Sequence, residues 1–412
     1  MARDSKPRRS NGRGISKSEK RTRKSPSKKR DDEGKTNNAD GLAAESVKAR
    51  QIQSSKEFEG GAETCRQGFK SIDSRSQLDR DRPLSKLQLQ RFEEFTRDAV
   101  TIGVKGVLDE YAAYLKPYVP PDVTRTAFDA NLKKNRYSDV VCADGSRVVL
   151  RNHTTDYIHA NFVRGDPLIN TFICTQGPMQ DSVKDFWKMV SQEQVGNIIM
   201  LCDTIEQGKE KCQQYWPREQ GGVVEFPGIQ VRNIKIDNSD TTTLVSTLEL
   251  TFEKKEKLTL KHHHWRTWPD KSVPQSVLAP FRLLKNVRHS ARPTVVHCSA
   301  GIGRTGSVVA LELCYQQLLS ENKLSVLESV KALRKQRMHA VQTELQYLYL
   351  YKCLLTFSQK SRTVPAEIQA AFDKFESEYQ TLIDSKLHED KPDEAYAPLT
   401  PLKLGKFAPI PM

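Results

Sequence analysis

Near residue 84 the chain changes from a polar, aperiodic pattern to one with regularly spaced apolar positions. Residues 1–83 are rich in Lys, Arg, Ser, Asp and Gly and show neither a helical nor a strand period, so we predict a disordered tail. Beyond it, apolar residues recur every three or four positions in two runs, which predicts two helices that end before Pro117. The runs consist of Leu89, Phe92 and Phe95, and of Leu108, Tyr111 and Leu115.

The middle of the chain alternates short apolar runs with amphipathic stretches. Strands are predicted around 148–150, at 157–163 and at 197–201, with a helix through 185–189 before the last of them. Residues 206–260 resemble antiparallel ribbons, because polar and apolar residues alternate there, most clearly at 248–252. Strands alternating with helices predict an α/β or α+β domain.

The C-terminal part continues the same alternation. A buried strand at 294–296 is followed by predicted helices at 307–319, 323–336 and 347–357. A further apolar stripe predicts a helix packed on the body of the domain. The stripe consists of Ile368, Phe372, Phe375, Tyr379 and Leu382. We therefore predict a basic tail at 1–83, one catalytic domain at 84–358, and a C-terminal helix with a proline-containing tail at 359–412.

Most of the positive charge belongs to the N-terminal tail. The net charge is +14, and residues 1–30 hold 13 Lys or Arg against 2 Asp or Glu. The basic run 20–30 is compatible with nucleic acid, anionic lipid or the nuclear import machinery, and equally with a solvated tail that has no specific partner. Pro398 and Pro401 fit either a ligand for an SH3-type groove or a stiff tail.

Cysteine usage and hydropathy indicate a compartment. The eight cysteines show no metal-binding spacing, the N-terminus has no apolar signal region, and no apolar run reaches the roughly 18 residues of a membrane span. We expect an intracellular protein, cytoplasmic or also nuclear, without a transmembrane segment. His262, His263 and His264 suggest a metal site, but neighbours on a strand face opposite sides and no further ligands complete it, so we predict none.

The strand at 294–296 and the helix at 307–319 are joined by a loop suited to phosphate. Gly301 and Gly303 allow it to curl so that backbone N–H groups converge at the start of the helix, where anions bind. Among such donors and beside Arg304, Cys298 is favoured as the thiolate, which is a nucleophile. Arg304 offers two N–H groups to phosphoryl oxygens. The alternative is an inert buried cysteine beside a surface arginine.

A phosphocysteine mechanism also needs an acid for the leaving group, and Asp270 is the candidate. It follows Trp268 and Pro269 on a turn, where a rigid hinge could swing the carboxyl group over bound substrate and exclude water. By itself the tripeptide would more often be an ordinary turn. Together with the cysteine loop it indicates acid catalysis.

The chain resembles the tyrosine-specific, cysteine-dependent protein tyrosine phosphatases of non-receptor type over roughly residues 85–358. The matching segments are KNRYSDV at 134–140, DYIHAN at 156–161, TQGP at 175–178, DFW at 185–187, KCQQYWP at 211–217, WPD at 268–270, HCSAGIGRTG at 297–306 and QTELQY at 342–347. The resemblance implies one domain with a twisted mixed sheet flanked by helices. It also implies hydrolysis of phosphotyrosine in partner proteins through a phosphocysteine, without metal or other cofactor.

Roles follow from the resemblance position by position. Cys298 would be the nucleophile, Asp270 the acid and then the base, and Arg304 the phosphate clamp. Thr305 would hydrogen-bond the thiolate, and Gln342, assisted by Gln346, would hold the water. The phosphate cradle would be the backbone of Ser299, Ala300, Gly301, Ile302, Gly303 and Arg304; Tyr137 and Asp139 would bind the substrate tyrosine and its backbone; and His297, Glu206, Lys211, Trp268 and Pro269 would support the site.

Three departures from the family pattern affect the surroundings of the site and leave its catalytic groups intact. Lys271 and Ser272 follow the acid, where many members have an aromatic residue or His followed by Gly. His339 replaces a small residue and Ser138 a basic one. The alternative function is a catalytically weak pseudophosphatase or adaptor that binds phosphotyrosine without turnover.

Overall fold

The structure is a computed structural model, and it describes residues 83–253 and 256–389. The basic run 20–30 and the prolines at 398 and 401 lie outside the described residues. The helices are α2 (Lys86–Glu110), the π-helix η1 (Tyr111–Leu115), α3 (Thr126–Ala130), α4 (Val183–Gln192), α5 (Ala279–Val287), α6 (Arg304–Leu319), α7 (Val326–Gln336), α8 (Glu344–Lys360) and α9 (Gln369–Glu389). The strands are β1 (Arg147–Val149), β2 (Tyr157–Val163), β3 (Phe172–Thr175), β4 (Asn197–Met200), β5 (Ile205–Glu206), β6 (Lys209–Glu210), β7 (Val223–Phe226), β8 (Ile229–Asp237), β9 (Thr243–Phe252), β10 (Lys257–Trp265) and β11 (Thr294–His297).

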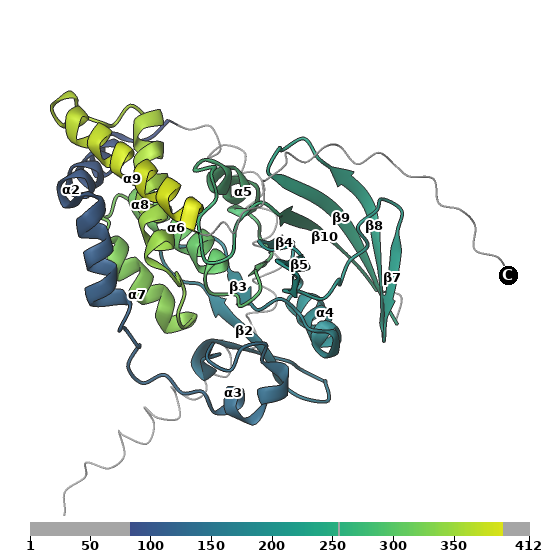
Figure 1. The fold of residues 1–412 in the computed structure, drawn as a ribbon. Coiled ribbons are helices and arrows are strands. Elements are labelled where there is room, and N and C mark those ends of the chain that lie inside the picture. The colour runs from purple at the N-terminus through teal and green to yellow at the C-terminus, as the bar shows by residue number, and fades with distance from the viewer. Residues whose placement is uncertain (1–82, 254–255, 390–412) are drawn as a thin grey trace, which may run out of the picture. The chain divides into compact units, whose positions relative to one another are not determined.

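A mixed sheet forms the centre of the described region (Figure 1). Its strand order is β1-β2-β3-β11-β4-β10-β9-β8-β7, so β11 lies between β3 and β4 and runs parallel to both. The predicted ribbons at 206–260 form β7 to β10 by antiparallel pairing, but β10 also pairs in parallel with β4, which a local alternation pattern could not reveal. The carboxyl ends of β3, β11 and β4 therefore meet at one edge, where loops can build a site.

The two predicted N-terminal helical runs are present, joined by a sharp break. Gly103 has φ 68° and ψ 172° within α2, a conformation that glycine adopts without steric cost. The second run ends as the π-helix η1, whose Tyr111 and Leu115 are buried. The helical segment stops near Lys116, before the prolines, as predicted.

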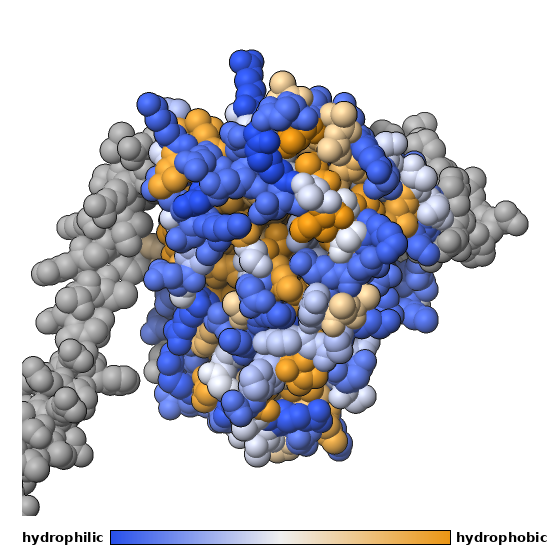
Figure 2. Space-filling view, turned by 90° about the vertical axis from the view of Figure 1, so that its left-hand side faces the viewer, coloured by the Kyte–Doolittle hydropathy of each residue, from blue (hydrophilic) through white to orange (hydrophobic). Residues whose placement is uncertain are grey.

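Helices pack beside part of the sheet and share its core. Figure 1 shows α2, α6, α7, α8 and α9 grouped together beside the strands. The predicted C-terminal stripe packs inward, because Phe372, Phe375 and Tyr379 are buried in the main core cluster. The outward face of this side is mostly hydrophilic with scattered apolar residues (Figure 2), as expected for amphipathic helices. Within the described ranges, no helix combines the length and apolar content that crossing a bilayer requires.

Three helix starts differ from the pattern-based expectation for local reasons. The helix predicted from 347 begins at Glu344, since the Thr343 side chain accepts a hydrogen bond from the Gln346 amide and caps it. The helix predicted from 323 begins at Val326, since the Ser325 side chain accepts a hydrogen bond from the Glu328 amide and caps it. The helix predicted from 307 begins earlier, at Arg304, directly after the loop glycine Gly303. The clamp candidate Arg304 is therefore the first residue of α6.

Candidate active site

The loop between β11 and α6 curls around the sulfur of Cys298. The amide nitrogen of Gly301 lies 3.2 Å from Cys298 Sγ. Gly301 has φ 72°, and a Cβ atom there would lie 2.1 Å from the carbonyl oxygen of Thr175, so only glycine fits. The Gly177 amide donates to the Ser299 carbonyl at 2.9 Å, which ties the loop to the segment after β3.

Arg337 is a buried arginine that sequence analysis did not identify, and it donates hydrogen bonds to backbone carbonyls of this loop. Arg337 Nε donates to the Gly301 carbonyl at 2.9 Å, and Nη2 donates to the Ala300 carbonyl at 3.0 Å. Its third nitrogen, Nη1, donates to Asn161 Oδ1 at 2.7 Å. Two loop carbonyls are therefore turned away from the sulfur, which leaves N–H groups to face an anion. Arg337 directly follows the helix predicted at 323–336. A basic residue at that place in the sequence is typically exposed to solvent, so nothing in the sequence pattern indicates its burial.

Arg304 is almost completely buried and makes a two-point ion pair. Its Nη1 and Nη2 lie 2.6 and 2.9 Å from the two carboxylate oxygens of Glu206, which β5 supplies. Nη1 also donates to the Trp268 carbonyl at 3.0 Å. This planar two-point contact fixes the orientation of the guanidinium. Arg304 Nε is buried and has no hydrogen-bond partner among the described residues.

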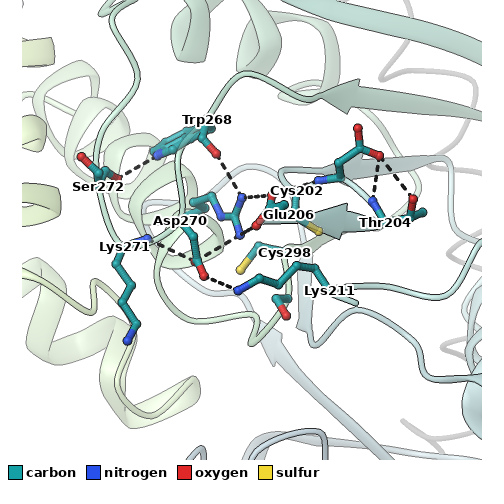
Figure 3. A network of polar contacts seen from close by, with 12 residues as sticks. Cys202, Thr204, Glu206, Lys211, Trp268, Asp270, Lys271, Ser272 and Cys298 are labelled. Atoms are coloured by element: carbon teal, nitrogen blue, oxygen red, sulfur yellow. Dashed lines mark hydrogen bonds and ion pairs between the residues drawn. The ribbon is translucent and has the colours of Figure 1, made fainter. Parts of the chain in front are cut away.

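Asp270 lies between two cations. Its Oδ1 is 3.1 Å from Arg304 Nη2, and its Oδ2 is 2.7 Å from Lys211 Nζ (Figure 3). Partial burial alone would raise the pKa of Asp270, but Arg304 and Lys211 outweigh it and hold this pKa below its ordinary value. The carboxyl group is therefore ionised in the free site at neutral pH. About a third of the Asp270 side chain is exposed (33%), so solvent reaches it.

The loop that carries Asp270 is held by contacts of Trp268 and of Lys271. Trp268 Nε1 donates to the Ser272 carbonyl at 3.1 Å, and the Trp268 ring packs against Trp265, with ring centres 4.9 Å apart. The hydroxyl of Thr343 donates to the Lys271 carbonyl at 3.2 Å. Lys271 adopts a left-handed backbone with φ 57°, which turns the chain directly after the acid.

Tyr137 comes from a segment about 160 residues earlier and reaches the same loop. Its hydroxyl lies 2.9 Å from Ser299 Oγ, and its side chain is partly buried. The preceding Lys134 is fixed by Asp185, with Lys134 Nζ 2.8 Å from Asp185 Oδ2. Asp139 is exposed. The Tyr137 ring therefore lies beside the cysteine loop, and Asp139 faces solvent.

The residues predicted to act on water face the cysteine loop, Gln342 from the segment before α8 and Gln346 from its first turn. The Gln346 side chain accepts from the Gln342 amide at 2.9 Å, and a Cβ atom on Gly303 would lie 3.0 Å from Gln342 Oε1. The Gln342 side chain therefore points at the cysteine loop. The Thr305 hydroxyl, predicted to bond the thiolate, is buried and has no hydrogen-bond partner in the described part of the chain.

His297 belongs to a buried chain of polar groups behind the nucleophile. Burial lowers the pKa of His297 to about 3, so the ring is neutral. Its Nδ1 lies 3.2 Å from the Cys298 carbonyl, which can only accept, so Nε2 accepts from the Tyr215 hydroxyl at 2.7 Å. Tyr215 in turn lies 2.8 Å from His262 Nε2.

The other two adjacent histidines also have protein partners. His263 Nε2 lies 3.2 Å from Asn197 Oδ1, and His264 Nε2 lies 2.9 Å from the Cys202 carbonyl. Among the residues that the structure describes, no group of three or more His, Cys, Asp or Glu side chains is arranged to hold a metal.

Comparisons with known proteins give one consistent result. The protein-tyrosine phosphatase family model matches residues 131–356. The chain is 36% identical over 284 residues to the tyrosine-protein phosphatase non-receptor type 9 of Mus musculus, a match that covers 64% of this chain and 48% of that protein. It is 39% identical over 282 residues to the Homo sapiens protein of the same name, covering 63% of this chain and 47% of that one. It thus spans about half the length of the curated relatives it matches.

A solved structure extends the similarity to the fold. The catalytic domain of human protein tyrosine phosphatase non-receptor type 18 aligns with a TM-score of 0.57 and 31% sequence identity. The alignment covers 65% of this chain and 99% of that chain. Nearly the whole of that catalytic domain therefore has a counterpart here.

Proposed function

This chain belongs to the protein-tyrosine phosphatase family, and on that premise we propose that it hydrolyses phosphotyrosine in proteins through a phosphocysteine. The family's fold is present: a single phosphatase domain with a mixed sheet flanked by helices. Cys298 is the nucleophile, Arg304 the phosphate clamp and Asp270 the acid and then the base. The observation that carries the proposal is the convergence of Gly301 N–H, Arg304 and Asp270 on one sulfur-bearing loop.

The ion pair between Asp270 and Arg304 gives the first step a defined order. An arriving phosphate dianion competes with the Asp270 carboxylate for Arg304 Nη2, which lies 3.1 Å from it. Once Arg304 binds the phosphate, Asp270 loses a cation and gains a negative neighbour, and both changes favour its protonated form. Cys298 Sγ then attacks phosphorus, the P–O bond breaks, and Asp270 protonates the departing tyrosine oxygen.

The second step reverses the role of Asp270. Gln342, whose side chain faces the loop, holds a water molecule against the phosphocysteine. Asp270 takes a proton from that water as its oxygen attacks phosphorus, the P–S bond breaks, and Cys298 leaves as a thiolate. Inorganic phosphate is the product.

Preference for phosphotyrosine rests on the position of Tyr137. Its hydroxyl lies 2.9 Å from Ser299 Oγ, so its ring forms a wall directly beside the cradle. The aromatic ring of a phosphotyrosine can stack on the Tyr137 ring as its phosphate enters the cradle. Phosphoserine is shorter and has no ring that could stack there. In this proposal Asp139, which is exposed, bonds the backbone of a substrate peptide. The substrates are phosphotyrosine proteins.

We further propose an intracellular site of action. The seven cysteines within the described residues are all unpaired thiols, as expected in a reducing compartment. Binding of the basic tail to nucleic acid, lipid or import factors, an SH3-type partner near Pro398, and nuclear location stay predictions.

The proposal is tested by release of phosphate from a phosphotyrosine peptide by the full chain in the presence of a chelator. Cys298→Ser should reduce the rate by about four orders of magnitude or more, because serine is a far weaker nucleophile in this setting. The matched control is Cys314→Ala, which alters a buried cysteine within α6. Phosphopeptide binding without turnover by the wild type would instead indicate the adaptor function, and turnover by Cys298→Ser would exclude the assigned nucleophile.

A further inference from the structure

The loop that presents Gln342 has a backbone that needs support. Within residues 337–342, His339 has φ 60° and Val341 has φ 61°, both in the left-handed region. A β-branched residue rarely adopts that conformation, and it persists only where neighbouring groups over-determine it. The groups that hold this loop therefore decide where the Gln342 side chain points.

Three consecutive carbonyl groups of the loop are each bound by a side chain. Arg334 Nε donates to the Ala340 carbonyl at 2.9 Å, and Arg334 Nη2 donates to the Val341 carbonyl at 2.8 Å. The third carbonyl, that of Gln342 itself, accepts from the Tyr111 hydroxyl at 2.6 Å. Arg334 Nη1 also donates to the carbonyl of Leu115, the last residue of η1. The loop is thus held between α7 and η1.

Tyr111 comes from the π-helix η1, outside the segment 131–356 that matches the family model. Its side chain is buried, with its ring packed against Tyr347 at 5.8 Å between centres. Burial raises the pKa of Tyr111, so its hydroxyl keeps the proton that it donates. The hydroxyl lies 2.6 Å from the Gln342 carbonyl oxygen and 3.5 Å from that of Val341, so the bond to Gln342 is the shorter of the two.

We propose that Tyr111 is a positioning residue for the second step of the reaction, acting through its hydrogen bond to the Gln342 carbonyl. The inference rests on the proposed function. By fixing that carbonyl, Tyr111 fixes the side-chain amide that holds water against the phosphocysteine. Without this hydrogen bond the Gln342 side-chain amide is placed less precisely and discriminates less strongly between water and a small alcohol. The alcohol can then attack phosphorus in place of water. The P–S bond then breaks in the same way, Asp270 takes the alcohol proton, and an alkyl phosphate forms.

The experiment compares Tyr111→Phe with the wild type, using the full chain, an aryl phosphate and added glycerol. The measured quantity is the ratio of glycerol phosphate to inorganic phosphate, determined by phosphorus NMR. Loss of one hydrogen bond should raise this ratio about fivefold, and should raise the fraction of protein trapped as phosphocysteine by acid quenching. Tyr114→Phe is the matched control, because Tyr114 lies in the same π-helix but is 58% exposed, and it should behave as the wild type.

The product ratio is independent of how much protein is folded, so it separates positioning from stability. A ratio in Tyr111→Phe equal to that of the wild type overturns the inference, as does an equal rise in Tyr114→Phe. A slower first burst of aryl alcohol with an unchanged ratio also overturns it, since Tyr111 would then act on the first step. If the wild type releases no aryl alcohol at all, the proposed function itself is wrong. That outcome differs from an unchanged product ratio in an active enzyme, which overturns only the role of Tyr111.

Discussion

The cysteine loop and the acid loop meet at one point but are held in different ways. The cysteine loop is buried, and backbone groups together with Arg337 fix its conformation. Asp270 in the acid loop is a third exposed, and its carboxyl group is held by ion pairs to Arg304 and Lys211. In the proposed mechanism, an arriving phosphate competes for one of these ion pairs but for none of the hydrogen bonds from Arg337. The cradle is therefore formed before substrate binds, whereas the acid adjusts to it.

The largest effect expected from this contrast is that of Asp270→Asn. Its first-turnover rate with phosphotyrosine should fall by about 10² to 10⁴, because the tyrosine oxygen leaves poorly without a proton. With 4-nitrophenyl phosphate the loss should be much smaller, since that leaving group needs little protonation. Rapid mixing with both substrates measures the two losses. Equal losses would mean that residue 270 acts on the cradle and does not serve as an acid.

Gly301→Ala should slow both substrates, in contrast to the unequal losses expected for Asp270→Asn. The added Cβ would lie 2.1 Å from the Thr175 carbonyl, so the loop must shift, and a shift of about 1 Å costs about 10² in rate. Both substrates should lose the same factor, because the cradle serves every phosphate ester. Gly221→Ala is the control, since Gly221 also has a left-handed φ, 82°, but no atom within 4 Å of the added Cβ. If the control loses as much activity, backbone strain alone explains the effect.

The smallest expected effect is a displaced pH profile in Lys211→Met. Arg304 and Lys211 hold the pKa of Asp270 below its ordinary value, and removal of Lys211 lets this pKa rise. Asp270 then keeps its proton to higher pH, so the falling basic limb of kcat/KM should move to higher pH. Profiles of wild type, Lys211→Met and Lys209→Met, an exposed lysine on β6, measure the shift. A shift to lower pH in Lys211→Met would contradict the assigned electrostatics.

The sequence predicted the cysteine loop better than the residues that support it. The strand at 294–296, the tight loop and the helix after it are consecutive in the chain, so a local pattern contains all three. Glu206 and Lys211 entered only through the family resemblance, and the structure places them against Arg304 and Asp270. Arg337 could not be found, because periodicity shows which face of a helix is apolar but not which distant carbonyl a side chain reaches.

The fold shows the same division between local and distant information. Most of the predicted helices and strands are present, and the two predicted N-terminal runs are separated at Gly103, but β3 and α5 were not predicted. The parallel pairing of β10 with β4 was not predicted, since no local signal tells a strand which partner lies on its second edge. The apolar pattern placed Tyr111 in a helical run. It could not show the hydrogen bond from the Tyr111 hydroxyl to the Gln342 carbonyl, because the two residues lie far apart in the chain.

The place of β11 in the sheet has a consequence for biosynthesis. This strand inserts between β3 and β4, which leave the ribosome well before it. Until then the two earlier strands have nothing to bridge them, and their open edges are sites for misassociation. A nascent chain that stops short of β11 therefore lacks the strand that joins β3 to β4, and it also lacks Cys298, which follows that strand directly.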